Sequence, residues 1–218
     1  MKAKISIFLL ASLFLFGFLM NIYINTDNEL SDVADKIIRL HVVANSDSPA
    51  DQQLKLEIRD RVIKSMSGRF EGLKDIGEVK RVIESSLGEI ESIARETIKE
   101  SGKLYDVKAA LAKKDFPTKS YGNLTLPAGS YQALNIVIGK GEGKNWWCVM
   151  FPPLCFIDVA HGVVPEETMK ELKSSLTEEE YRLLVAEKQP GEIPVKLRFK
   201  ILEIAKTFNL KLARLGER

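Results

Sequence analysis

The stretch "KIIRLHVVANSDSPADQQLKLEIRDRVIKSM", residues 36–66, joins a strand pattern to a helix pattern through a short polar break. Residues 36–45 are rich in β-branched residues, and the run is too short for a surface helix, which predicts a buried strand. Ser48 is a good N-cap, and Pro49 suits the first helical position. We therefore predict a helix from Pro49 to about Met66.

Downstream, the periodicity changes twice. From Asp75 to about Glu100, apolar residues recur every three or four positions, which is typical of a long amphipathic helix. Residues 105–151 are rich in Tyr, Val, Ile and Thr and are broken by Gly and Pro, which predicts a meander of three or four strands. The segment "GKGEGK", residues 139–144, lacks the Lys-Ser/Thr ending of a phosphate-binding loop, so we interpret it as a hairpin loop.

The last third returns to helical patterns. Residues 165–175 and 177–188 both open with acidic first turns, and Thr177 is a suitable cap for the second. The segment 196–218 carries seven Lys or Arg and two Glu, and it changes from a strand pattern to a helix pattern. The predicted fold is α+β: an antiparallel sheet of four or five strands, which residues 36–45 join, with helices mainly on one face.

The N-terminal residues predict a membrane address. Lys2 and Lys4 precede the uncharged run Ile5–Ile24, and the next positive charge is Lys36. This pattern places the N-terminus inside the cell and the following chain outside. Twenty apolar residues can span a bilayer, and no small-x-small cleavage site follows, which favours a signal-anchor over a cleaved signal peptide. Residues 25–35 are interpreted as an acidic tether to a single extracytoplasmic domain, residues 36–218.

The charge of the chain is close to balanced. Lys2 and Lys4 account for the whole formal net charge of +2, so the exported part is neutral. A neutral domain does not predict nucleic-acid binding.

Both cysteines lie in "NWWCVMFPPLCF", residues 145–156. An exported protein can oxidise them, and Pro152-Pro153 supplies a bend between them, so we predict a disulfide between Cys148 and Cys155. Two buried free cysteines are the alternative.

The sequence gives less support to a catalytic cysteine, a zinc site or paired catalytic carboxylates. A nucleophilic cysteine would need His41 or His161 beside it, and a pair drawn from two histidines is expected by chance. The same four side chains lack the tight C-x2-C spacing that usually begins a zinc site. The carboxylates Asp115, Glu142 and Asp158 follow no distinctive spacing, so we predict no catalytic residues, no metal and no cofactor.

Trp146 and Trp147 point to opposite faces if they lie on a strand. One of them is then a candidate for an exposed aromatic anchor at an interface. Core packing of the whole aromatic cluster is the alternative.

Three segments together resemble one protein family. They are "RLHVVANSDSPADQQLKLEIRD" (residues 39–60), "YGNLTLPAGSYQALNIVIGKGEG" (121–143) and "GKNWWCVMFPPLCF" (143–156). They are similar to segments of stage II sporulation protein R of endospore-forming bacteria. The resemblance implies a non-enzymatic signal that is made in the forespore and exported to the space between the two membranes. There it would trigger a mother-cell membrane protease, stage II sporulation protein GA, which cleaves the precursor of sigma-E.

The resemblance brings no catalytic residues, so the site hypothesis concerns contacts. The first candidate surface comprises Trp146, Trp147, Phe151, Pro152 and Pro153, and the second comprises Asn45, Ser46 and Asp47. Both segments could instead specify the fold. Two rival functions stay open: an exported thiol-dependent or cell-wall-acting enzyme, and a membrane-surface module that uses the basic segment 196–218.

Overall fold

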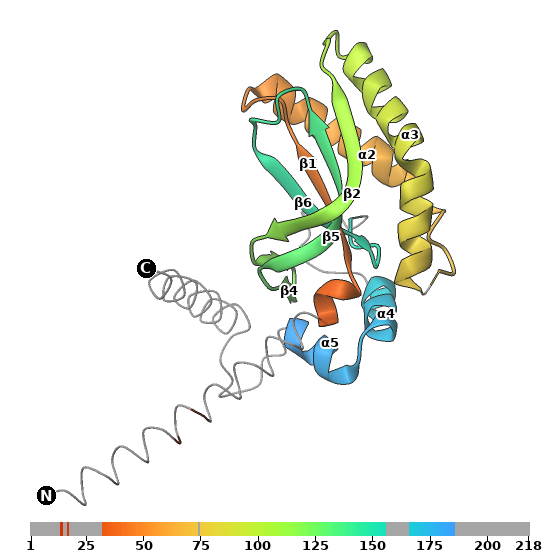
Figure 1. The fold of residues 1–218 in the computed structure, drawn as a ribbon, viewed down its shortest axis with the longest axis vertical. Helices are drawn as coiled ribbons and strands as arrows, with labels where there is room; N and C mark the ends of the chain where they lie inside the picture. The colour runs from red at the N-terminus through yellow and green to blue at the C-terminus, as the bar shows by residue number, and fades with distance from the viewer. Residues whose placement is uncertain (1–13, 15–16, 18–31, 74, 156–165, 186–218) are drawn as a thin grey trace, which may run out of the picture.

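The computed structural model describes residues 32–73, 75–155 and 166–185, together with the isolated positions 14 and 17. Two long helices lie beside a twisted sheet, and two short helices lie near one end of it (Figure 1). In chain order the elements are β1 (Ile38–Val43), α2 (Pro49–Ser67), α3 (Ile76–Glu100), β2 (Val107–Phe116), β3 (Lys119–Tyr121), β4 (Leu124–Leu126), β5 (Gly129–Ile138), β6 (Asn145–Phe151), α4 (Glu166–Ser175) and α5 (Glu178–Leu184). The predicted α+β class is confirmed.

The main sheet is mixed, which corrects the prediction of an antiparallel sheet. Its strand order is β2-β5-β1-β6, and β3 and β4 form a separate pair. β1 runs parallel to β5 and antiparallel to β6, so Leu40 lies opposite both Leu134 and Cys148. All six residues of β1 are buried, and a strand so placed gains hydrogen-bond partners on both edges by lying between two others.

The position of β1 also corrects the interpretation of residues 139–144. They connect β5 to β6, but these strands are not neighbours, so the segment is not a hairpin loop. It instead passes over the end of β1, where Gly143 N–H donates to Ala44 O over 2.9 Å.

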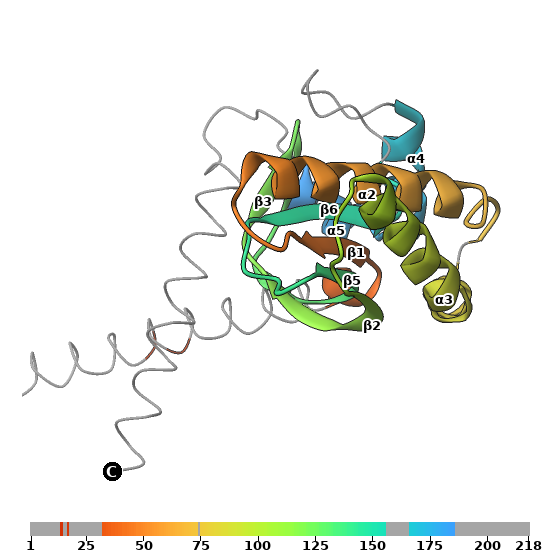
Figure 2. The same ribbon diagram turned by 90° about the horizontal axis from the view of Figure 1, so that it is seen from above.

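The two long helices confirm their predicted bounds, and α2 also confirms its predicted Ser48 cap. The Ser48 hydroxyl accepts a hydrogen bond from Asp51 N–H, and the Asp75 carboxylate accepts one from Glu78 N–H. Seen from above, α2 lies along the sheet with α3 beside it (Figure 2). Their apolar faces and one face of the sheet form the larger core, whose fully buried members include Ile38, Leu40, Ile58, Ile83 and Leu134.

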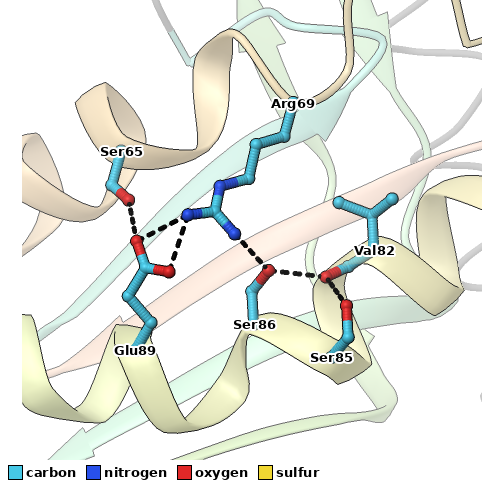
Figure 3. A network of polar contacts seen from close by, with 6 residues as sticks. All are labelled: Ser65, Arg69, Val82, Ser85, Ser86 and Glu89. Atoms are coloured by element: carbon cyan, nitrogen blue, oxygen red, sulfur yellow. Dashed lines mark hydrogen bonds and ion pairs between the residues drawn. The ribbon is translucent and has the colours of Figure 1, made fainter.

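A polar clamp fixes the end of α2 to the middle of α3 (Figure 3). Arg69 donates to both carboxylate oxygens of Glu89 over 2.7 and 2.6 Å, and to the Ser86 hydroxyl over 3.0 Å. Ser65 also donates to Glu89, over 2.9 Å. Arg69 Nη2 makes both contacts to Glu89 and Nη1 contacts Ser86, so one guanidinium joins the chain after α2 to two residues of α3. Hydrogen bonds between charged groups are stronger than neutral ones, which strengthens this contact.

A second, smaller core lies on the other side of the sheet. Val33, Phe116, Leu124, Val149 and Leu184 are among its buried members. Residues 32–35 of the predicted tether form a helical turn here, so the packed domain begins before residue 36. α5 carries the predicted Thr177 cap in a complete capping box with Glu180.

Several predictions concern residues outside the described part of the chain. These are nearly all of the membrane segment Ile5–Ile24, the residues Asp158 and His161, and the basic segment 196–218. Within the described residues, none of the helices has the length and apolar character that crossing a membrane requires.

Candidate functional site

The candidate site is built on residues 145–155, which we call the Trp-Cys-Pro segment. Cys148 in β6 forms the predicted disulfide with Cys155, and their Cα atoms are 5.5 Å apart. A cis peptide bond precedes Pro152, and the chain turns so that Leu154 and Cys155 both donate to Val149 O, over 3.2 and 2.9 Å. The disulfide and these hydrogen bonds close the end of β6 into a compact corner.

We expect removal of the disulfide to lower the free energy of unfolding by about 2 kcal/mol, because the crosslink closes a short loop in the unfolded chain. The double variant Cys148→Ala/Cys155→Ala and the reduced wild type should show the same urea midpoint, below that of the oxidised protein. Equal midpoints for the oxidised and reduced wild type would contradict the expected stabilisation.

Trp147 lies on the sheet face that carries the smaller core, where it packs flat against His41. The two ring centroids are 4.0 Å apart with an interplanar angle of 2°, and Phe116 meets Trp147 edge-on at 4.7 Å. His41 Nδ1 contacts Asn135 Oδ1 at 3.0 Å, and Nε2 contacts Asn145 Oδ1 at 2.8 Å. Burial lowers the pKa of His41, although both hydrogen bonds oppose the shift. These contacts place His41 in a structural role.

Trp146 lies on the opposite face, as the strand pattern predicts. The Arg59 guanidinium of α2 sits 4.1 Å from its ring centroid. The negative face of an aromatic ring's quadrupole attracts a cation, so Arg59 holds the Trp146 ring against α2. Both tryptophans are half-buried, and each is therefore held by the fold and also reaches the surface.

Hydrogen bonds of Asn45, Ser46 and Asp47 join two loops. We call residues 44–51 and 139–144 together the interlocked loops. The buried Asp51 carboxylate accepts hydrogen bonds from Asn45 Nδ2 at 2.9 Å, Ser46 Oγ at 2.6 Å and the Tyr105 hydroxyl at 3.1 Å. Hydrogen bonds from Asn45 and Ser46 hold the pKa of Asp51 below its ordinary value.

The first loop also accepts hydrogen bonds from the backbone of residues 139–144. Asn45 Oδ1 accepts from Lys140 N–H at 3.0 Å, and Asp47 Oδ1 accepts from Lys144 N–H at 2.7 Å. The polar residues of "ANSDSPADQ" therefore have a structural role, because their side chains hold the two loops together. That the same residues touch a partner stays a prediction.

Sequence reasoning missed Arg39, which is the second residue of β1 and is fully buried. Its guanidinium lies 4.1 Å from the Phe116 ring centroid and donates to the Tyr121 hydroxyl over 2.7 Å. No carboxylate in the described part of the chain pairs with it, and burial lowers its pKa. The available signal was a lone charge inside an apolar strand pattern.

A pocket of about 220 Å³ opens beside the Pro152-Pro153 corner. Phe151 and Pro152 are buried beneath it, while Pro153 is half-buried. The opposite wall is the turn between α2 and α3, and the end of α4 completes the lining. The lining residues are Ser67, Phe70, Glu71, Gly72, Leu73, Phe151, Pro152, Pro153, Ser174 and Ser175. Three of the five residues in the first candidate surface therefore meet at one hollow.

No group of His, Cys, Asp and Glu side chains suited to a metal ion occurs among the described residues.

Comparisons with known proteins agree on one family. A family model described as stage II sporulation protein R matches residues 34–161. The protein of that name from Bacillus subtilis (strain 168) is 46% identical over 154 residues, which cover 70% of this chain and 69% of the relative. No match to a solved structure was found.

Proposed function

This chain belongs to the stage II sporulation protein R family, and we propose that it is the exported signal that activates stage II sporulation protein GA to cleave the sigma-E precursor. Family membership supports a role in sporulation signalling. The observation that carries the activator role is the construction of the Trp-Cys-Pro segment, which is closed by a disulfide and presents partly exposed aromatic and proline side chains. Rigid aromatic surfaces of this kind serve recognition well.

The same geometry argues against the rival thiol-dependent enzyme. Thiol catalysis needs a thiolate beside a base, but Cys148 and Cys155 are bonded to each other. Asparagine side chains contact both ring nitrogens of His41, and the ring is packed against Trp147. The two cysteines and His41 are therefore not available to form a cysteine–histidine pair.

The proposed location is the space between the forespore and mother-cell membranes. Lys2 and Lys4 before the apolar run Ile5–Ile24 support export with the N-terminus inside, and we propose that this run stays as an anchor. The disulfide is consistent with an oxidising extracytoplasmic space.

Reconstitution in a heterologous cell tests the proposal. The cell would contain stage II sporulation protein GA, the sigma-E precursor and either this protein or a version that lacks residues 1–24 and stays inside. We expect precursor cleavage only with the exported form. Absence of cleavage, when immunoblots show all three proteins and protease mapping shows correct insertion, would overturn the proposed activation.

A further inference from the structure

We propose that the pocket beside Pro152-Pro153 receives one large apolar side chain, flanked by a Lys or Arg, from the extracytoplasmic part of the activated protease. This inference rests on the proposed function for the identity of the partner. It places the contact with the protease at this one pocket, and it specifies an apolar side chain with a neighbouring positive charge as the group that enters.

The floor of the pocket is apolar and aromatic. Phe70 and Phe151 are 5% and 6% exposed, and their rings meet edge-on with centroids 6.3 Å apart. Leu73 is partly buried against the same core. Small-molecule sites usually occupy about 300–1,000 Å³. A pocket of about 220 Å³ falls below that range, and its size suits a single inserted side chain.

Both walls are held in place before any partner arrives. On one side, the disulfide and the two hydrogen bonds to Val149 O fix the Pro152-Pro153 corner. On the other, Arg69 is clamped to Glu89 and Ser86 immediately before Phe70 (Figure 3). A preformed pocket loses little conformational freedom when an anchor enters, so more of the contact energy appears as affinity.

The rim of the pocket selects a cation. Among the described residues that line the pocket, Glu71 is the only charged one, and it is exposed. None of the ion pairs among the described residues involves Glu71. A carboxylate at the edge of an apolar hollow complements an apolar anchor with an adjacent positive charge, and such rim charges act mainly on specificity and on the rate of association.

Two substitutions test the pocket in the reconstituted cell. Glu71→Lys reverses the rim charge, and Ser67→Trp places a large side chain at the pocket from the last residue of α2. We expect each variant to lower the rate of precursor cleavage about tenfold. Glu84→Lys makes the same charge change at an exposed position of α3 outside the pocket lining, and it should stay within about twofold of wild type. Urea midpoints of the variants establish that they remain folded.

Photo-crosslinking separates this inference from the activation itself. A photoreactive amino acid at position 71 or 153 of the full chain should crosslink to the protease, and the same probe at position 84 should not. Crosslinks without cleavage would support the pocket and overturn activation. Normal cleavage with no crosslink from 71 or 153, and with an unaffected Glu71→Lys variant, would overturn the pocket alone. Failure of both cleavage and crosslinking would overturn both.

Discussion

Asp51→Ala is expected to lower the free energy of unfolding by about 3 kcal/mol, because it removes a buried carboxylate that accepts three side-chain hydrogen bonds. The donors Asn45, Ser46 and Tyr105 would be left without their acceptor in a partly buried site. Loss of the bond to Asn45 also loosens the side chain that holds Lys140 N–H. Urea unfolding followed by tryptophan fluorescence measures the change.

The matched control is Glu57→Ala, which removes an exposed carboxylate from the same helix and should change stability by less than about 0.5 kcal/mol. A loss at Asp51 no larger than this would show that the carboxylate does not hold the interlocked loops.

Asp51 also gives the stability of the wild-type protein a pH dependence, which follows from linkage. Hydrogen bonds from Asn45 and Ser46 lower the pKa of Asp51 in the folded state, so the unfolded chain binds this proton at a higher pH. The stabilisation is therefore complete above the unfolded pKa, near 4, and is lost as the pH falls through the folded value. Asp51→Asn should lack this part of the acid destabilisation.

Gly143→Ala is expected to destabilise the protein by about 3 kcal/mol, because the added Cβ meets backbone atoms. It would lie 2.3 Å from the Ser46 carbonyl oxygen and 2.6 Å from the Ser46 carbonyl carbon. The two loops would have to separate, which weakens the hydrogen bonds from Gly143 to Ala44 and from Lys144 to Asp47. Thermal and urea unfolding measure the loss.

Gly88→Ala provides the control for this prediction. Gly88 lies within α3, and nothing lies within 4 Å of its added Cβ. Alanine should therefore stabilise the helix by about 0.5–1 kcal/mol. A destabilising effect at Gly143 together with a stabilising effect at Gly88 would identify steric contact, and not glycine content, as the cause. An unchanged midpoint for Gly143→Ala would contradict the observed closeness of the loops.

Both predictions concern the junction that places β6 in the sheet. Residues 139–144 carry the chain from β5 over the end of β1, and β6 starts directly afterwards at Asn145. The Trp-Cys-Pro segment therefore depends on the interlocked loops for its position. Variants at Asp51 or Gly143 should reduce signalling through the loss of folded protein, whereas Glu71→Lys should reduce it in protein that stays folded.

The sequence by itself determined the local structure. Local patterns predicted the cap at Ser48 with Pro49, the apolar stripe of α3 and the cap at Thr177, because each depends on residues within one or two turns. The bond between Cys148 and Cys155 was also predictable, because only two cysteines exist and a proline bend lies between them.

Only the tertiary structure decided which distant segments meet. The apolar run of β1 predicted burial, but no local pattern specifies that a strand will lie parallel to β5 and separate it from β6. Asn45 resembled a surface loop residue because its partner Lys140 lies 95 positions away. The pocket at Phe151 likewise needs the turn after α2, and Arg39 found its aromatic neighbours in β2 and β5. These pairings arise from the combined burial and hydrogen bonding of the whole sheet, which no short window of sequence contains.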